Sequence, residues 1–164
     1  MVNVLDKVQP KNKTQLKRLI DYAFKHNIYD LNFIDTSKIT NMSYLFMNCE
    51  YDIDVSNWDV SNVTTAFCMF VGCKKFNSDL SNWNMANVKT AGYMFIGCES
   101  FEGKGLEHWD VSNVTDMASM FYYCKNFDCD LSNWDVSNVT NTAGMFYYCK
   151  NFDCGLSYWD VSNV

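Results

Sequence analysis

The chain has 164 residues, of which 48% are hydrophobic and 16% aromatic, and this composition predicts a folded domain with a hydrophobic core. The formal net charge of −6 argues against a nucleic-acid partner, because phosphate binding needs clustered Lys and Arg. No apolar stretch approaches the roughly 20 residues of a membrane-spanning helix, so we expect no membrane span.

The N-terminal region predicts a helical cap. Between residues 14 and 26 the apolar side chains fall on one helical face, at Leu16, Leu19, Ile20, Ala23 and Phe24. Asn12 or Thr14 is the expected N-cap. The first ten residues lack the features of a secretory signal, which favours a cytoplasmic protein. We predict a capping region over residues 1–29 and a repeat region over residues 30–164.

Two phrases recur through the repeat region in a fixed order. The first is W-D-V-S-N-V or a degraded form of it, and its tryptophans follow one another at intervals of 25 or 26 residues: Trp58, Trp83, Trp109, Trp134 and Trp159. The second is M-F-x-x-C or a relative, which ends at Cys49, Cys73, Cys98, Cys124 and Cys149. Repetition at this period predicts stacked units that share one continuous core, with equivalent tryptophans as neighbours. We expect one diverged repeat and about five further repeats, the last one incomplete.

The spacing within each phrase predicts its local structure. Trp134 and Val136 are two residues apart, the period of a short strand. Met117, Phe121 and Cys124 follow the i, i+4, i+7 spacing of one helical face. The predicted fold class is therefore an α/β repeat solenoid, in which each coil carries a short parallel strand and a short helical segment behind an N-terminal helical cap.

The combined phrase F-x-x-C-x-x-F-x-x-x-L-S-x-W-D-V-S-N-V resembles the BspA-like leucine-rich repeat surface proteins, in particular the branch filed as a mycoplasma domain of unknown function. The resemblance covers roughly residues 30 to 164. It implies leucine-rich-repeat-like, right-handed coils, display on the cell surface and attachment to host or matrix proteins. Surface display by resemblance thus stands beside the cytoplasmic location that the missing signal favours.

No catalytic constellation is visible, so we expect a protein that is not an enzyme and needs no cofactor. The two histidines, His26 and His108, lie far apart in the chain, and the usual hydrolase and phosphate-loop motifs are missing. The cysteines of M-F-x-x-C are predicted to act as small buried hydrophobes, and no metal site is expected. Cys129 and Cys154 occupy equivalent loop positions, which brings a disulfide within reach in an oxidising setting.

The positions around each tryptophan form a polar face that we predict to bind a protein partner. Its candidate binding residues are Asp59, Asn82, Asn84, His108, Asp110, Asn133, Asp135, Tyr158 and Asp160. The repeated Asp either binds a cation or a basic partner, or accepts hydrogen bonds from its own turn, and we favour the turn. The repeated Asn of S-N-V is either a glycosylation acceptor or a hydrogen-bond donor to the neighbouring coil, and we favour the donor.

Two further sets of residues are candidate interfaces. Exposed tyrosines are enriched at protein interfaces, and the chain carries two pairs of them: Tyr122, Tyr123, Tyr147 and Tyr148. At the C-terminal end, Leu156, Trp159 and Val161 form an apolar edge that predicts an end-to-end homo-oligomer. The predicted function is a non-catalytic repeat scaffold for protein–protein binding, such as an adhesin. The alternative is a structural component that assembles through this end.

Overall fold

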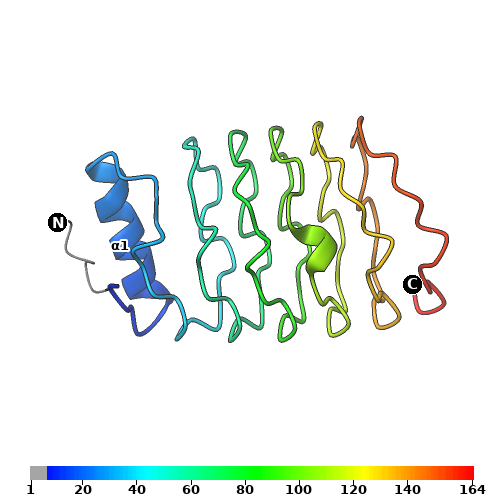
Figure 1. The fold of residues 1–164 in the computed structure, drawn as a ribbon, viewed down its shortest axis with the longest axis horizontal. Coiled ribbons are helices and arrows are strands. Elements are labelled where there is room, and N and C mark those ends of the chain that lie inside the picture. Colours follow the sequence, from blue (N-terminus) through cyan, green and yellow to red (C-terminus); the bar gives the residue numbers. More distant parts are fainter. Residues whose placement is uncertain (1–6) are drawn as a thin grey trace.

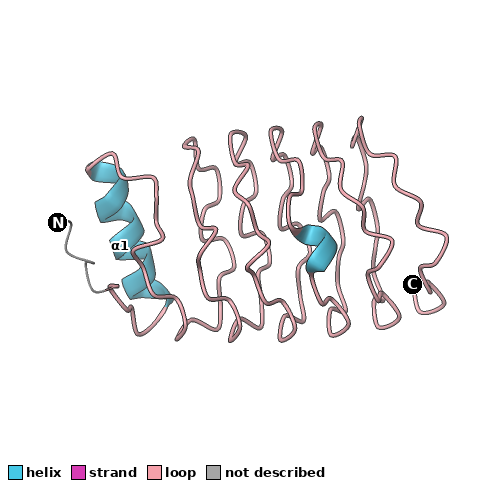
Figure 2. Ribbon diagram, in the orientation of Figure 1, coloured by secondary structure: helices cyan, strands magenta, loops and turns pink. Residues whose placement is uncertain are grey.

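The computed structural model describes residues 7–164, which form a row of irregular coils stacked one on another (Figure 1). Helix α1 (Lys13–Lys25) lies at the N-terminal end of the row, and a short 3₁₀ helix, η1 (Leu106–His108), interrupts one loop. The other described residues are turns, bends and loops (Figure 2). Residues 1–6 of the predicted capping region lie outside the described residues. In the described chain no helix has the length and apolar character needed to span a membrane.

The prediction of an α/β repeat solenoid is wrong, and so is the prediction of leucine-rich-repeat-like coils. Over residues 7–164 neighbouring coils are joined by isolated parallel bridges, and no strand extends beyond a single bridge, so there is no sheet. One row of bridges runs through consecutive coils at Asn41, Thr65, Thr90, Asp116 and Asn141. Apart from η1, the described part of the repeat region contains no helix.

The W-D-V-S-N-V phrase forms turns instead of a strand because its backbone donors bond within their own coil. The Trp134 N–H donates to the Leu131 carbonyl at 3.0 Å, and the Val139 N–H donates to the Val136 carbonyl at 2.9 Å. A ladder needs these groups to point at the next strand. The predicted alternation of inward and outward side chains is nevertheless correct, because Trp134, Val136 and Val139 are buried and Asp135 is exposed.

The M-F-x-x-C phrase lies in five nine-residue turn segments, which we number from position 1 to position 9: residues 41–49, 65–73, 90–98, 116–124 and 141–149. Positions 4 and 8 adopt left-handed backbone in every segment, as Ser119 (φ 50°) and Tyr123 (φ 64°) illustrate. In the first four segments, the N–H groups of positions 2, 4, 6 and 8 donate to carbonyls of the following coil at 2.7–3.1 Å. A helix cannot accommodate either feature, so the predicted helical segments are wrong.

The turn segments explain why the helical prediction failed. Met117, Met120, Phe121 and Cys124 are buried, and these are positions 2, 5, 6 and 9, the same i, i+3, i+4, i+7 spacing that a helix buries. Here the spacing comes from consecutive turns that send two side chains inward and the next two outward. The outward pairs are positions 3 and 4 and positions 7 and 8, except that the small position-3 residues Gly92 and Ala118 are buried.

Helix α1 confirms the predicted amphipathic helix, with bounds one residue earlier than expected. Asn12 is its N-cap, and the Asn12 side chain accepts a hydrogen bond from the Gln15 N–H at 3.0 Å. Leu16, Ile20 and Ala23 are fully buried against the first coils. The Lys13 ammonium donates to the carbonyl of Ser43, a group that points out of the first turn segment.

The tryptophans stack as the repeat period predicts. The rings of Trp83, Trp109 and Trp134 lie 6.2 and 6.3 Å apart and within 3° of parallel. Each indole N–H donates to a carbonyl of the preceding coil, as from Trp134 to Leu106 at 2.8 Å. A second ladder stacks the phenylalanines of position 6, with Phe95 and Phe121 5.7 Å apart. A buried Trp removes about 150–250 Å² from water, which contributes roughly 4–6 kcal/mol per coil as an upper bound.

Gly97 provides a direct test of the turn segments. It is at position 8 with φ +69°, and an added Cβ would meet only ordinary contacts of 3.7 Å and beyond. In a helix Gly97→Ala would raise the free energy of unfolding by about 1 kcal/mol. In the observed left-handed backbone we expect it to lower that free energy by about 1–2 kcal/mol in urea denaturation.

The matched control is Gly97→Asn, because Asn tolerates left-handed backbone and Asn48 already occupies position 8 of the first turn segment. The decrease in the free energy of unfolding should be smaller for Gly97→Asn than for Gly97→Ala. A stabilising Gly97→Ala substitution would contradict the turn geometry.

Candidate interaction surfaces

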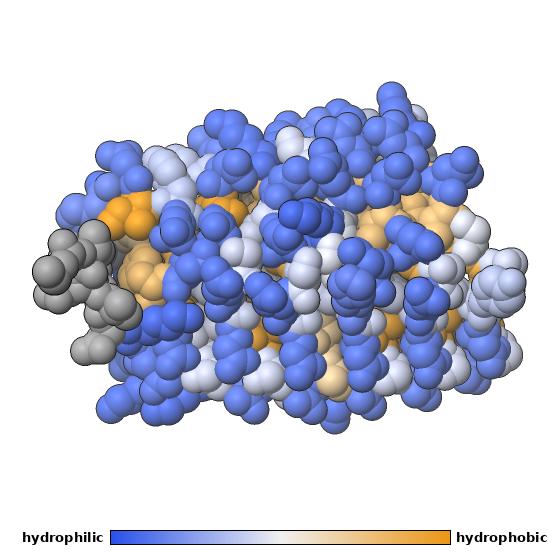
Figure 3. All heavy atoms as spheres, in the orientation of Figure 1, coloured by the Kyte–Doolittle hydropathy of each residue, from blue (hydrophilic) through white to orange (hydrophobic). Residues whose placement is uncertain are grey.

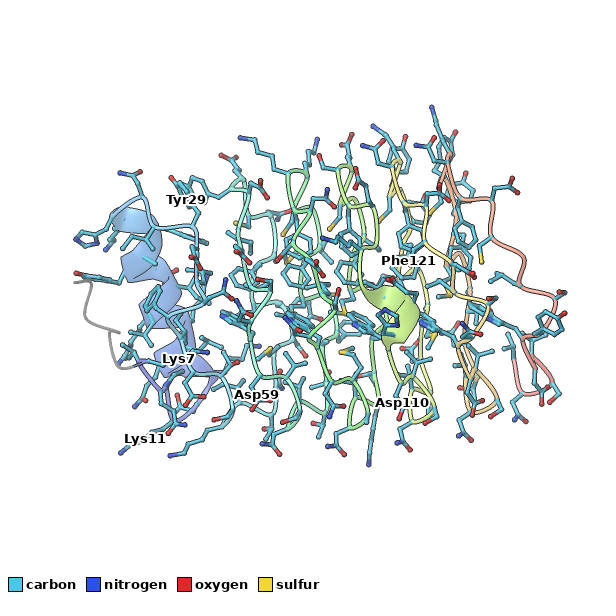
Figure 4. All side chains as sticks on the ribbon, in the orientation of Figure 1. Lys7, Lys11, Tyr29, Asp59, Asp110 and Phe121 are labelled. Carbon is cyan, nitrogen blue, oxygen red and sulfur yellow. The ribbon has the colours of Figure 1, made fainter. Side chains whose placement is uncertain are left out.

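The repeated aspartates of the polar face cap their own turns, which confirms the favoured interpretation. In Asp59, Asp110, Asp135 and Asp160, one carboxylate oxygen accepts the N–H of the serine two residues later at 2.9–3.1 Å. Asn84 accepts the Ala86 N–H in the same way at 3.1 Å. Figure 4 shows Asp59 and Asp110 on the same side of the stack, two repeats apart. The row of carboxylates is therefore a row of Asx turns.

The asparagines of S-N-V form the predicted ladder. Their side-chain amides donate to a carbonyl of the preceding coil at 2.7–2.8 Å, and the donors are Asn62, Asn87, Asn113, Asn138 and Asn163. Because each amide N–H₂ is engaged by the backbone, this Asn contributes to stacking.

The remaining residues of the predicted polar face are exposed and loosely held. The Asn82 amide lies 3.5 Å from the Ser56 carbonyl, and His108 Nε2 lies 3.6 Å from a Glu107 carboxylate oxygen. Asn133 is exposed, and Tyr158 is 87% exposed. Figure 3 shows hydrophilic side chains lined up from coil to coil over most of the face that it displays. This surface offers polar contacts to a partner.

The titratable residues form no metal centre in the part of the chain that the structure describes. His26 ends α1, where its ring packs on Tyr22 with centroids 4.1 Å apart. Over residues 7–164 no group of three or more His, Cys, Asp or Glu side chains has the geometry to hold a metal ion. No described set of residues therefore fits a metal or a cofactor that would need such ligands.

The position-9 cysteines lie inward as predicted and also donate across coils. The thiols of Cys73, Cys98 and Cys124 lie 2.9–3.1 Å from the carbonyl of the position-6 Phe in the preceding coil. Burial raises the pKa of Cys73 to about 12 and the pKa of Cys98 well above its ordinary value. Cys129 and Cys154 are both free thiols in this structure.

The outward pairs of the turn segments form an apolar surface that we name the aromatic stripe. It contains Tyr44, Met47, Phe67, Val71, Tyr93, Ile96, Tyr122, Tyr123, Tyr147 and Tyr148. All ten side chains are exposed or half-buried. The four C-terminal tyrosines of the stripe were predicted from the sequence, and the other six residues were not. Their shared signal was the placement at positions 3, 4 and 7 of the repeated phrase.

Ring contacts join the stripe from coil to coil. Tyr122 stacks on Tyr147 at 4.8 Å, and Tyr123 stacks on Tyr148 at 4.9 Å. Phe67 lies edge-on to Tyr44 and to Tyr93, at 5.6 and 5.4 Å. Tyr123, Tyr147 and Tyr148 remain 37%, 52% and 48% exposed. The structure therefore places the four predicted tyrosines in one patch.

The predicted C-terminal interface residues line a shallow pocket of about 280 Å³. Leu156, Trp159 and Val161 form one side of it, and Met145 and Phe146 form the other. Leu156 and Trp159 are half-buried, and Val161 is exposed. End-to-end association through this pocket stays a prediction.

Acid should weaken the fold through Asp79, which caps a turn like those of the polar face. The Lys104 ammonium, 2.6 Å away, and the Ser81 hydroxyl lower the pKa of Asp79 to about 2. Because this pKa lies below the unfolded value of about 3.9, the contribution to stability is complete above about pH 4 and is lost as the pH falls toward about 2. The urea midpoint should therefore exceed that of the Asp79→Asn variant at neutral pH. An equal difference at pH 7 and at about pH 2 would contradict this role.

Thiol reactivity should follow burial. Under iodoacetamide at about pH 8, the half-buried Cys68 and Cys154 should be alkylated first, because only the thiolate reacts and it must be reached by solvent. Cys73, Cys98 and Cys124 should react only after unfolding in urea, as followed by peptide mass mapping. Early alkylation of Cys98 in the folded protein would contradict the buried, hydrogen-bonded position.

Comparison with known proteins gives one match. No curated protein and no solved structure matches the chain. The model of one protein family matches residues 14–106 and 94–164, which together cover most of the chain and all the turn segments. The chain belongs to the family described as Mycoplasma protein of unknown function, DUF285.

Proposed function

We propose that this protein is a non-catalytic repeat scaffold that binds a protein partner through the aromatic stripe. The observation that carries the proposal is the patch of Tyr122, Tyr123, Tyr147 and Tyr148, whose stacked rings remain half exposed along two coils. Tyrosine is enriched at the energetic centres of protein interfaces, since it supplies a large apolar area together with a hydroxyl group.

Preorganisation of the stripe supports this function. Backbone hydrogen bonds between coils hold three of the four tyrosines. The Tyr123 N–H donates to the Tyr147 carbonyl at 2.8 Å, and the Tyr122 carbonyl accepts the Gly97 N–H at 2.9 Å. Lys125 lies 5.3 Å from the centre of the Tyr123 ring and is paired with Glu99 at 2.5 Å, which holds it beside the patch. Side chains ordered before binding lose less entropy when a partner arrives.

The polar face supports binding less strongly. Its aspartates and asparagines already use hydrogen-bonding groups for their own turns and for the preceding coil, as in Asp110 and Asn113. A partner there would meet exposed charges in water, which contribute little affinity. The resemblance of the repeated phrases to BspA-like surface proteins supports an attachment role as well, and we propose an adhesin-like interaction as the finer function.

The proposal is tested by capture of partner protein from a lysate of the source organism. In the stripe variant, Tyr123→Ser, Tyr147→Ser and Tyr148→Ser are combined, and the immobilised variant should retain less than about a tenth of the captured protein, because hot-spot residues each contribute about 2 kcal/mol or more. Quantitative mass spectrometry measures the retained protein.

The matched control combines Asp110→Asn and Asp135→Asn, which removes two charges of the polar face and keeps the turns, as Asn84 shows. This control should capture partner as well as the unmodified chain. Loss of capture in the control with retention in the stripe variant would move the binding site to the polar face. Both variants should keep the thermal midpoint of the parent within a few degrees, as roughly 1 kcal/mol shifts it by about 2–8 °C.

A further inference from the structure

Resting on the proposed function, we propose that the partner of the aromatic stripe is a second copy of this chain. The two copies lie side by side about a twofold axis that runs along the stack. Each turn segment then meets the same segment of the other copy, with positions 3 and 4 opposite positions 7 and 8. Such a pairing is isologous, so every contact occurs twice.

The shape of the last two turn segments fits this arrangement. Positions 7 and 8 carry the four tyrosines Tyr122, Tyr123, Tyr147 and Tyr148, which form a ridge. Positions 3 and 4 carry only small side chains there. Ala118 is buried, and the half-buried Ser119 with the exposed Ala143 and Gly144 forms a furrow beside the ridge. The two features adjoin, since a Cβ added at Gly144 would lie 3.7 Å from Tyr122 Cδ2. Rotation about the stack axis places the ridge of each copy in the furrow of the other.

The charges at the two edges of the stripe are also complementary. Lys125 follows the ridge at its outer edge, and Asp116 precedes the furrow at the opposite edge. One Asp116 carboxylate oxygen accepts the Ala118 N–H at 3.0 Å, and the other lies against Gly92 of the preceding coil, on a half-buried side chain. The twofold rotation brings Lys125 of one copy toward Asp116 of the other. Lys125 already pairs with Glu99 at 2.5 Å, so Asp116 adds a second carboxylate to that pair, once on each side of the axis.

The area of the stripe is sufficient for a weak dimer. Aromatic side chains bury about 150–250 Å² each, so the partly exposed members of the stripe offer roughly 600 Å² per copy. Two copies would bury about 1,200 Å² in total, the lower limit of specific interfaces. The preformed ridge lowers the entropic cost, and we expect a dissociation constant in the micromolar range.

The experiment is sedimentation equilibrium of the full chain between about 1 and about 100 µM, the range in which a micromolar dimer dissociates. Two variants interrupt the two halves of the contact. The ridge variant combines Tyr123→Ser, Tyr147→Ser and Tyr148→Ser, and the furrow variant is Ala143→Arg, which fills the furrow and leaves every tyrosine in place. The unmodified chain should dimerise, and each variant alone should stay monomeric.

A mixture of the two variants provides the decisive result. The intact ridge of the furrow variant can enter the intact furrow of the ridge variant, and the new arginine then faces the space that the removed tyrosines leave. The mixture should therefore form a heterodimer, which misfolding of either variant would prevent. Circular dichroism melts of each variant, compared with the parent, show whether a failure to mix comes from unfolding, in which case Ala143→Gln replaces Ala143→Arg.

The orientation is tested by zero-length carbodiimide cross-linking of mixed light and heavy isotope-labelled copies. Cross-links between Lys125 and Asp116 of different copies support the axis along the stack. Cross-links between Glu50 and Lys150 would overturn it, because they require reversed coil order.

Failure of this inference can be told apart from failure of the proposed function. A chain that stays monomeric at about 100 µM overturns the dimer, and capture that is lost only in the ridge variant then still supports binding of a different protein. A dimer that persists in both variants and is lost in Leu156→Ser with Val161→Ser also overturns it, in favour of end-to-end association.

Discussion

The structure depends on hydrogen bonds that run between coils along the turn segments. At positions 2, 4, 6 and 8 of the first four segments, the backbone N–H groups donate forward, to carbonyls of the following coil. Side-chain donors point the other way: the indole of Trp134 and the amide of Asn138 bond carbonyls of the preceding coil. Each bond contributes only about 0.5–1.5 kcal/mol, so stability comes from their repetition along the stack together with the buried rings.

This direction of the backbone donors determines the surface as well as the core. Sending alternate N–H groups toward the next coil requires the left-handed residues at positions 4 and 8, including bulky Tyr123 and Tyr148. The same turns drive side chains outward in pairs. The exposed tyrosines and the buried Phe121 are therefore two consequences of one backbone path. Left-handed tyrosines cost about 1–2 kcal/mol each, a strain that residues at functional surfaces often carry.

Burial and stacking could be predicted from the sequence, because a side chain's period along the chain decides which neighbours it meets. The ladder of Trp83, Trp109 and Trp134 and the Asx turn at Asp110 follow from that period alone. The secondary structure could not be predicted from the sequence, since consecutive turns and a helix bury the same i, i+3, i+4, i+7 positions. Gly72 and Gly97 at position 8 are residues that favour left-handed backbone. Tyr123 and Tyr148 occupy the same position and do not favour it, so position 8 as a whole did not predict that conformation.

The candidate surfaces also differ in whether the fold itself engages their side chains. Polar groups that recur in every coil, such as Asp135 and Asn138, are engaged by the fold itself, so their regularity reflects stacking. Positions 3, 4, 7 and 8 vary in size from Gly144 to Tyr148, because most of their side chains lie at the surface and not in the core. Variation in size between neighbouring rows is what produces a ridge and a furrow, and shape of this kind is what one particular partner can recognise. In this stack the invariant positions therefore hold the coils together, and the variable outward pairs are where specificity can reside.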